Sequence, residues 1–409
     1  MPRTFSDKFL LSKPIEVLPS RHTVVGEGKN MDFTPTKEQL ERRDVARDFA
    51  QKEIYPKAGD IEKGHDVFPH EIVKKMYGLG LMSMTIPKKY DGSGWDYVSY
   101  AMGVEEVSRA SGSVGLITAA HNSLGVGHIC IDGNEEQKQR YLPMLATGKL
   151  SAWGLTESGA GSDADGTATV AERDGKDWIL NGSKVFITSA DEADVIVIIA
   201  VSDKNKKPHG TTAFIVNRNN PGYKIGQKED KLGMRGSPTS EIFLEDCRVP
   251  DEDRLGKEGD GFIGALKVLD GGRVSIAALS VGIAQGALDE SIKRAKERTA
   301  FGRPIGATEA IQWMIADMAT ETEAARFLTY RAAYLKDSGK RITTEGAMAK
   351  VYASEVAMRN GIKGIQVWGG HGYRLNAQIQ RHMRDAKLCE IGEGTSEIQR
   401  FVIARALLK

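Results

Sequence analysis

Glu393 is the residue best suited to acid–base chemistry, because it stands between two glycines in the segment IGEGTSEIQR, residues 391–400. Flanking glycines permit backbone conformations that other residues avoid, so this carboxylate can swing towards a bound substrate. A positioned carboxylate that removes a proton typically contributes ~10²–10⁴-fold in rate. The alternative is an ordinary solvated glutamate in the turn before a helix that Thr395 or Ser396 caps.

Two segments near the middle of the chain suit a flat, polar ligand. The first, GLTESGAGSD at 154–163, combines small residues that allow close backbone approach with hydroxyl and N–H groups for a heterocycle or a phosphate. The second, KVFIT at 184–188, places Phe186 and Thr188 two residues apart in a predicted strand, so both side chains face the same side. The alternatives are a loop between domains for the first segment and a core aromatic beside a surface hydroxyl for the second.

A third segment, QVWGGHGY at 366–373, has three glycines within four positions. Such clustering indicates close approach of the backbone to another group, or the turn that ends a helix. The segment alone does not distinguish between these two interpretations.

Helical patterns position these segments at both ends of the chain. Pro69 is suited to open one of the early helices, since its missing N–H is not needed there. Long, alanine-rich helices with short connections near the C-terminus are typical of a four-helix bundle. The predicted helices cover 36–56, 69–76, 99–110, 135–145, 274–298, 308–338 and 344–361.

Strand patterns separate the two helical regions. Two apolar runs around Asn181-Gly182 predict a β-hairpin, and further strands are predicted at 195–201, 213–216 and 241–244. Strands and helices do not alternate, so the region is expected to be antiparallel rather than a parallel dinucleotide-binding sheet. The predicted fold is therefore α+β. Its parts are an N-terminal extension (1–30), an N-terminal helical domain (31–150), a middle antiparallel β domain (151–262) and a C-terminal four-helix bundle (263–409).

Composition excludes several function classes. The chain has 409 residues with 56 Lys and Arg against 55 Asp and Glu, so no global basic excess indicates nucleic-acid binding. No uninterrupted apolar run approaches the roughly 20 residues that span a bilayer, so no membrane span is expected. The three cysteines, Cys130, Cys247 and Cys389, lie far apart without metal-site spacing, which indicates a reducing, cytoplasmic compartment. Residues 1–30 lack the apolar region of a secretory signal.

Taken together, the four segments resemble the acyl-CoA dehydrogenase family from about Met31 to the C-terminus. The resemblance implies an FAD-dependent homotetramer that removes two hydrogens from an acyl-CoA thioester and passes electrons to an electron-transferring flavoprotein. Glu393 matches the base that takes the α-proton while the β-hydrogen leaves as hydride to the flavin. The Glu393 backbone N–H and a flavin hydroxyl are expected to polarise the thioester carbonyl.

The resemblance also assigns ligand contacts. Thr156, Phe186 and Thr188 match contacts to the flavin ring, and the remaining cofactor matches are Arg298, Phe301, Gln366, Gly370, Thr395 and Glu397. Four of these, Arg298, Phe301, Gln366 and Gly370, correspond to residues that a partner subunit supplies. For the acyl-CoA, the matches are Ser162, Asp270 and Arg273, although the last two also fit ordinary charges on a helix surface. The residue before Arg273 is Gly272, so no rival base is expected there.

Asp91 departs from the glycine that relatives usually carry in this loop. The departure permits two interpretations, an exposed turn residue or a second acid facing the acyl group. A second acid would suit an alicyclic substrate of the cyclohexane- or cyclohex-1-ene-carboxyl-CoA type instead of a short linear acyl group. Rival functions are an acyl-CoA oxidase, which passes electrons to O₂, and a catalytically silent scaffold on the same fold.

Overall fold

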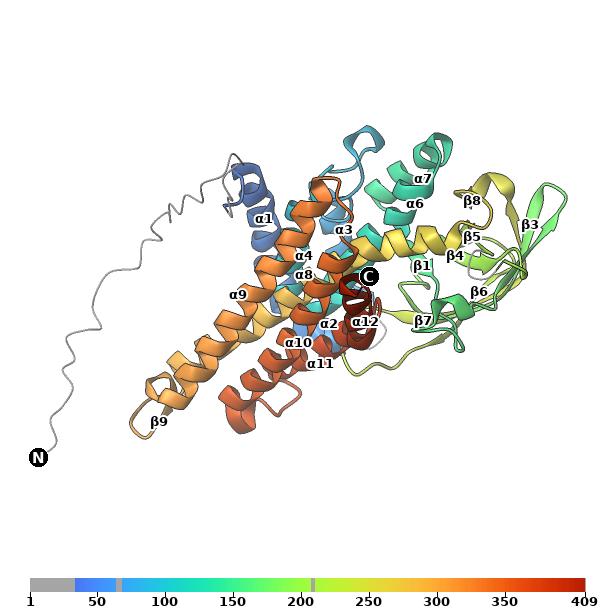
Figure 1. The fold of residues 1–409 in the computed structure, drawn as a ribbon. Coiled ribbons are helices and arrows are strands. Elements are labelled where there is room, and N and C mark those ends of the chain that lie inside the picture. The colour runs from blue at the N-terminus through green and yellow to red at the C-terminus, as the bar shows by residue number, and fades with distance from the viewer. Residues whose placement is uncertain (1–33, 64–67, 207–209, 409) are drawn as a thin grey trace, which may run out of the picture. The chain divides into compact units, whose positions relative to one another are not determined.

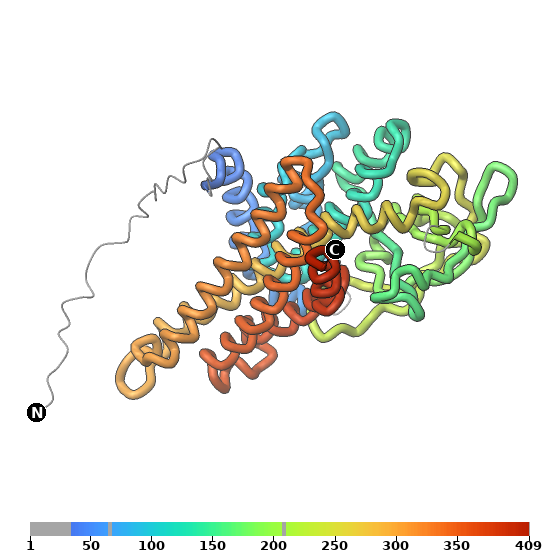
Figure 2. The backbone as a smooth tube through the Cα atoms, viewed as in Figure 1, coloured from blue at the N-terminus to red at the C-terminus, as the bar shows by residue number. Residues whose placement is uncertain are grey.

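The computed structural model describes residues 34–63, 68–206 and 210–408, so the predicted extension 1–30 lies outside the described residues. The chain divides into two units, Met1–Thr36 and Lys37–Lys409. The helices and strands from α1 to α12 lie in the second unit (Figures 1 and 2).

The first part of this unit is helical, as the sequence predicts. Its α-helices are α1 (Lys37–Phe49), α2 (Ala58–Lys63), α3 (His70–Gly78), α4 (Tyr97–Ala110), α5 (Gly112–Ala120), α6 (Val126–Asp132) and α7 (Glu135–Thr147). Sequence patterning missed α5, because all nine of its residues are buried and no polar face reveals a helical period.

Gly112–Asp132 is the one helical stretch in the described residues that is long and apolar enough to cross a membrane. It spans α5 and α6, and 83% of its most apolar window is buried inside the protein. Its apolar character is therefore explained by its position in the core.

The middle part forms a sheet of strands β1 to β8. They are β1 (Ser151–Gly154), β2 (Val170–Asp174), β3 (Asp177–Thr188), β4 (Val195–Val201), β5 (Thr211–Asn217), β6 (Tyr223–Lys228), β7 (Thr239–Pro250) and β8 (Arg254–Leu255). The strand order is β6-β7-β3-β2-β4-β5-β8, with β1 paired to β4. Most pairs are antiparallel, as predicted, while β4 pairs in parallel with β1 and β2.

The predicted hairpin around Asn181-Gly182 is wrong. These residues lie inside β3, a continuous strand of 12 residues paired with β2 on one side and β7 on the other. Gly182 sits at a register shift with φ 148°, and a Cβ there would approach Thr169 Oγ1 to 2.6 Å. Glycine therefore permits a bulge and a close strand contact here, and the chain reverses instead at Gly175, where φ is 63°.

The last part is the predicted helical bundle. Its elements are α8 (Gly261–Glu297), the strands β9 (Thr299–Ala300) and β10 (Arg303–Pro304), α9 (Glu309–Asp337), α10 (Thr343–Trp368), α11 (Gln378–Ile391) and α12 (Ser396–Leu407). The 37-residue α8 begins beside the sheet and continues through the bundle (Figure 1). One apolar core joins α8 and α10 to α4 and α5, so the N-terminal and C-terminal helices pack as one body.

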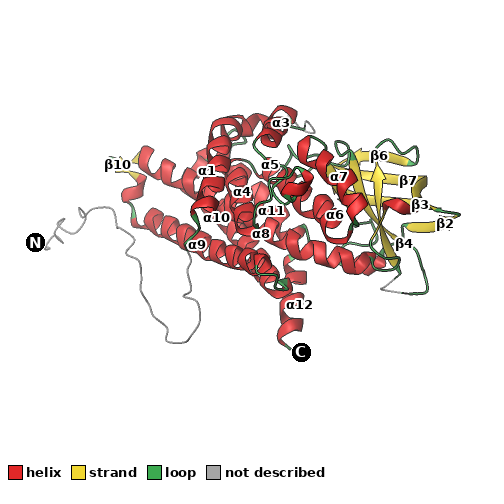
Figure 3. Ribbon diagram, turned by 90° about the horizontal axis from the view of Figure 1, so that it is seen from above, coloured by secondary structure: helices red, strands yellow, loops and turns green. Residues whose placement is uncertain are grey.

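A second apolar cluster lies between the sheet and the helices α6 and α7, which Figure 3 shows beside the strands. Alternate residues of β4 divide between this cluster and the cluster on the other face of the sheet. Both faces of β4 are therefore buried, which explains why all seven of its residues are apolar.

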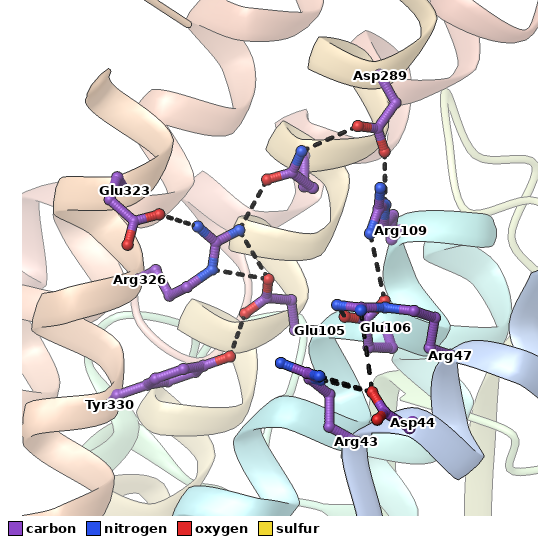
Figure 4. A network of polar contacts seen from close by, with 11 residues as sticks. Arg43, Asp44, Arg47, Glu105, Glu106, Arg109, Asp289, Glu323, Arg326 and Tyr330 are labelled. Carbon is purple, nitrogen blue, oxygen red and sulfur yellow. Dashed lines mark hydrogen bonds and ion pairs between the residues drawn. The ribbon is translucent and has the colours of Figure 1, made fainter. Parts of the chain in front are cut away.

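A network of ion pairs connects α1, α4, α8 and α9 (Figure 4). Glu105 on α4 accepts hydrogen bonds from Arg326 Nε at 2.9 Å and from Tyr330 Oη at 2.7 Å. Its neighbour Glu106 faces Arg47 at 2.5 Å and Arg109 at 3.5 Å. Each buried carboxylate is thus matched by cations on other turns or helices.

Candidate active site

The turn 392–395, called here the base turn, joins α11 to α12 and carries Glu393. The Thr395 hydroxyl accepts a hydrogen bond from Ile398 N at 3.3 Å and caps α12, as the sequence predicts. Glu393 has φ 53° and Gly394 has φ 93°, so both residues adopt left-handed conformations. A non-glycine residue held at positive φ is strained, and such strain concentrates at functional sites.

Glu393 is half-buried, and its carboxylate packs against α8. Its Oε2 atom is inaccessible to solvent and has no hydrogen-bond partner within the described part of the chain. A Cβ built at Gly272 would lie 1.9 Å from this oxygen and 3.4 Å from Leu124 Cδ2. Glycine at position 272 therefore leaves the space that the carboxylate occupies, and it supplies no competing acid.

The electrostatic setting of Glu393 suits a proton acceptor. Burial raises the pKa of Glu393 to about 7, while the positive charges of Lys350 and Arg273 act in the opposite direction. Arg273 is itself buried, with 5% of its surface exposed, and its Nη1 donates to Asp270 Oδ1 at 2.9 Å. Arg273 is therefore an interior cation, and the assignment of it and Asp270 to the acyl-CoA stays a prediction.

A second group of predicted residues gathers on the sheet. Val185 N donates to Thr156 O at 2.9 Å, which places the Thr156 segment beside β3. Phe186 has φ 58° and lies where the β3–β7 register shifts, and its side chain is 63% exposed. Thr188 is half-buried, whereas Ile187 between them points into the core. The structure thus places the Thr156 segment next to the part of β3 that carries Phe186 and Thr188, and the Phe186 ring is exposed at the bulge.

Sequence reasoning missed the ion pair that holds this face. Lys184 is fully buried and its Nζ donates to Glu157 Oε1 at 2.6 Å. The Glu157 carboxylate also accepts from Ala168 N at 2.7 Å and from Thr169 N at 3.0 Å. These contacts tie the loop after Thr156 to β3, and burial lowers the pKa of Lys184 to about 8. The sequence did contain a signal for this ion pair, because Lys184 is a charged residue at an inward-facing position of a predicted strand.

Four predicted cofactor residues lie elsewhere. Arg298 and Phe301 are exposed around the β9–β10 hairpin, and Gln366 and Gly370 are exposed at the end of α10. Trp368 Nε1 donates to Glu290 O at 3.2 Å, which fixes the end of α10 beside the last turns of α8. β9 and β10 lie at the end of the bundle away from β3 (Figures 1 and 3). Within one subunit these four residues therefore do not join the face formed by Thr156 and Phe186.

The last two predicted cofactor residues and one predicted substrate residue lie in separate places. Thr395 and Glu397 line a cavity of about 330 Å³ together with Arg359 and Lys387. Ser162 is exposed in the loop that follows Thr156.

Asp91 is exposed, has φ 61°, and borders a different cavity of about 760 Å³. The lining of that cavity, among the described residues, includes neither Glu393 nor a predicted flavin contact. The structure does not bring Asp91 together with Glu393, and its role as a second acid stays a prediction.

Comparisons with known proteins identify the family of the chain. Three family models match, namely the acyl-CoA dehydrogenase N-terminal domain over residues 36–149, the middle domain over 152–247 and the C-terminal domain over 259–408. The chain belongs to the acyl-CoA dehydrogenase family. It is 46% identical to a short-chain specific acyl-CoA dehydrogenase of Clostridium acetobutylicum, with 93% of this chain and 100% of the relative covered.

Two solved structures are also similar to this acyl-CoA dehydrogenase. The butyryl-CoA dehydrogenase of Megasphaera elsdenii is 41% identical, with a TM-score of 0.91, covering 93% of this chain and 100% of that chain. A chain solved in work on the electron transferring flavoprotein of Acidaminococcus fermentans is 44% identical, with the same TM-score of 0.91 and the same coverage.

As a member of this family the enzyme depends on FAD, and its residues fit that cofactor. Phe186 presents an exposed ring from a strained bulge, an arrangement that needs an apolar partner to be favourable. The loop after Thr156 offers open backbone, since a Cβ built at Gly159 or at Gly161 would meet nothing within 4 Å. A flat ring stacked on Phe186 with its polar edge at Thr156 is compatible with both observations.

Proposed function

We propose that this acyl-CoA dehydrogenase acts on short-chain acyl-CoA thioesters with Glu393 as the base. The observation that carries the proposal is the buried Glu393 carboxylate, whose Oε2 has no hydrogen-bond partner among the described residues and whose pKa is raised to about 7. A base with a pKa near the operating pH is ionised often enough to react and basic enough to remove a weakly acidic proton. The similarity to the short-chain specific and butyryl-CoA enzymes supports the substrate class.

The residues divide the chemistry between them. Glu393 takes the α-proton of the thioester through a carboxylate whose Oε2 is inaccessible to solvent. Its backbone N–H donates to no acceptor in the described structure, so it is available to the thioester carbonyl, where developing negative charge needs a donor. FAD, when bound, would supply the acceptor for the hydride from the β-carbon. Thr156, Phe186 and Thr188 orient the ring that receives it.

The decisive experiment replaces the base without changing its shape. Glu393→Gln retains FAD, and mixing it anaerobically with butyryl-CoA bleaches the flavin at least ~10²-fold more slowly than in the wild type. Glu390→Gln is the matched control, because Glu390 lies three residues earlier and pairs with Lys387 instead of the site. Rapid bleaching in Glu393→Gln would show that another group is the base.

A substrate panel tests the chain-length assignment. We expect butyryl-CoA to bleach the wild-type flavin faster than long-chain acyl-CoA thioesters do. Faster bleaching by cyclohex-1-ene-carboxyl-CoA than by butyryl-CoA would contradict the short-chain assignment and favour the alicyclic one.

The same proposal includes the partners and the compartment. A homotetramer would let the exposed Arg298 and Phe301 of one subunit reach the cofactor of another, because they do not reach the Phe186 face within their own subunit. An electron-transferring flavoprotein is the proposed acceptor, in a cytoplasmic setting. Reoxidation of the bleached enzyme by such a flavoprotein, and slow reoxidation by O₂, would distinguish this from an oxidase. Sedimentation measures the assembly.

A further inference from the structure

Two buried polar side chains hold the carbonyl groups of the base turn. Lys350 on α10 donates from Nζ to Gly394 O at 2.7 Å. Gln399 on α12 donates from Nε2 to the same oxygen at 2.9 Å and to Glu393 O at 3.2 Å. Neither Lys350 nor Gln399 has any exposed surface. The carbonyls on both sides of the Gly394 Cα atom are thus fixed from two helices.

Lys350 occupies an unusual place for a lysine. It stands in the buried stripe of α10 formed by Ala347, Ala353 and Ala357, which pack in the core. Within the described structure no carboxylate forms an ion pair with its ammonium group. A charge buried without an ion partner costs free energy. A lysine that forms a single hydrogen bond here, to Gly394 O, therefore indicates a functional role more than a packing role.

We propose that Lys350 and Gln399 are positioning residues that fix the left-handed conformation of the base turn and so aim both the carboxylate and the backbone N–H of Glu393 at the substrate. A peptide flip in this turn would turn a carbonyl towards the thioester and displace the base. The two donors oppose such a flip, because it would leave buried donors without acceptors. This inference rests on the proposed role of Glu393.

Lys350 has a second effect that Gln399 lacks. Its charge opposes the rise that burial causes in the pKa of Glu393. The other groups that act on Glu393 or on Lys350 are Arg273 on α8, Tyr100 on α4, and Cys389 and Glu390 on α11. Burial lowers the pKa of Lys350 to about 8, which is above the value of about 7 for Glu393, so Lys350 is mostly charged at the midpoint of the Glu393 titration.

The experiment separates geometry from charge with three variants of the FAD-loaded enzyme. Lys350→Met removes donor and charge, Gln399→Leu removes only donors, and Lys350→Arg retains a charged donor. Lys363→Met is the control, since Lys363 lies on the same helix but pairs with Asp317 and Glu321. Hydrogen exchange of the amides of residues 391–396 is measured without substrate, and flavin bleaching by butyryl-CoA is measured from pH 5.5 to 8.

Lys350→Met and Gln399→Leu are both expected to accelerate amide exchange in the base turn by about tenfold or more, since each loosens the turn locally. Only Lys350→Met moves the midpoint of the acid limb of the bleaching rate, upwards by about 0.5 to 1 pH unit, because an opposite charge is lost. Lys350→Arg retains the wild-type midpoint. Lys363→Met changes neither quantity.

Unchanged exchange in Lys350→Met or in Gln399→Leu would overturn the positioning role, whatever the bleaching rate. If Lys350→Met does not retain FAD, Gln399→Leu and Lys350→Arg decide the question, and a wild-type exchange pattern in Gln399→Leu rejects the proposal. Because exchange needs no turnover, a wrong base assignment and a wrong positioning assignment give different results.

Discussion

Two sites with buried carboxylates in the helical part of the protein are built in opposite ways. Glu105 and Glu106 are matched by Arg326, Tyr330, Arg47 and Arg109 from other turns and helices (Figure 4). Glu393 forms no ion pair within the described residues, although Lys350 and Arg273 lie near enough to act on its pKa. The first arrangement connects helices, whereas the second leaves a carboxylate ready to accept a proton.

The difference lies in which donors replace the water that each carboxylate loses when it is buried. Inside a protein an ionised acid is stable only when donors replace the lost water. The network supplies donors to both oxygens of Glu105, so replacing that acid is expected to affect stability. The Glu393 site withholds them, so replacing that acid is expected to affect chemistry. Four variants test this contrast.

The largest expected effect follows from filling the space beside Glu393. Gly272→Ala adds a Cβ that would lie 1.9 Å from Oε2, so the carboxylate must move away from its present position. We expect flavin bleaching by butyryl-CoA to slow about 10²-fold, because small displacements of a catalytic group are costly. Gly127→Ala is the control, since its Cβ would have its nearest neighbour at 3.8 Å. A wild-type bleaching rate in Gly272→Ala would mean that the carboxylate does not react from this position.

The next effect concerns the matched network. Glu105→Gln removes the buried one of the two carboxylates that pair with Arg326 and leaves only the more exposed Glu323, and we expect the unfolding midpoint to fall by about 5 °C. The bleaching rate per FAD is expected to stay within about threefold of wild type, since Glu105 takes no part in proton transfer. Differential scanning calorimetry and stopped-flow absorbance measure the two quantities. A large loss of rate with an unchanged midpoint would reverse the assignment of the two sites.

A smaller, pH-dependent effect is expected at Glu393 itself. Its folded-state pKa of about 7 lies above the ordinary glutamate value, so the folded protein binds this proton more tightly than the unfolded chain does. Stability from this group is therefore greatest below about pH 4.5 and is lost as the pH rises through about 7. Glu393→Gln cannot lose a proton, so its melting temperature relative to wild type is expected to rise from pH 5 to pH 7.5, by about 2 °C. A constant difference across this range would show that the carboxyl is not perturbed.

The sequence predicted the order of helical, β and helical parts because each has a distinct residue period. Glu393, Thr156 and Phe186 could be singled out because their motifs are local, and their roles stay predictions. It misassigned Asn181-Gly182, since a dipeptide that favours a turn also serves a bulge when strands flank it on both sides.

Lys350 and Gln399 escaped notice for a different reason. Their role depends on tertiary contacts of α10 and α12 with the base turn, and no local sequence motif predicts these contacts. A lysine within an alanine stripe was the one visible signal, because charged side chains are rarely placed in a core without a function.

Asp91 is expected to show the smallest effect, because it resembles neither carboxylate site. It is exposed, follows the short helix Lys88–Tyr90, and borders a cavity whose described lining lacks Glu393. We expect Asp91→Asn to change the bleaching rates with butyryl-CoA and with cyclohex-1-ene-carboxyl-CoA by less than about twofold, as for a surface substitution. Selective loss with the alicyclic thioester would instead identify Asp91 as a second acid. That result would require the loop to bring the exposed Asp91 carboxylate to the acyl group when the substrate binds. The comparison of ion-paired and unpaired acids in the helical part would then not account for all the proton transfer by the enzyme.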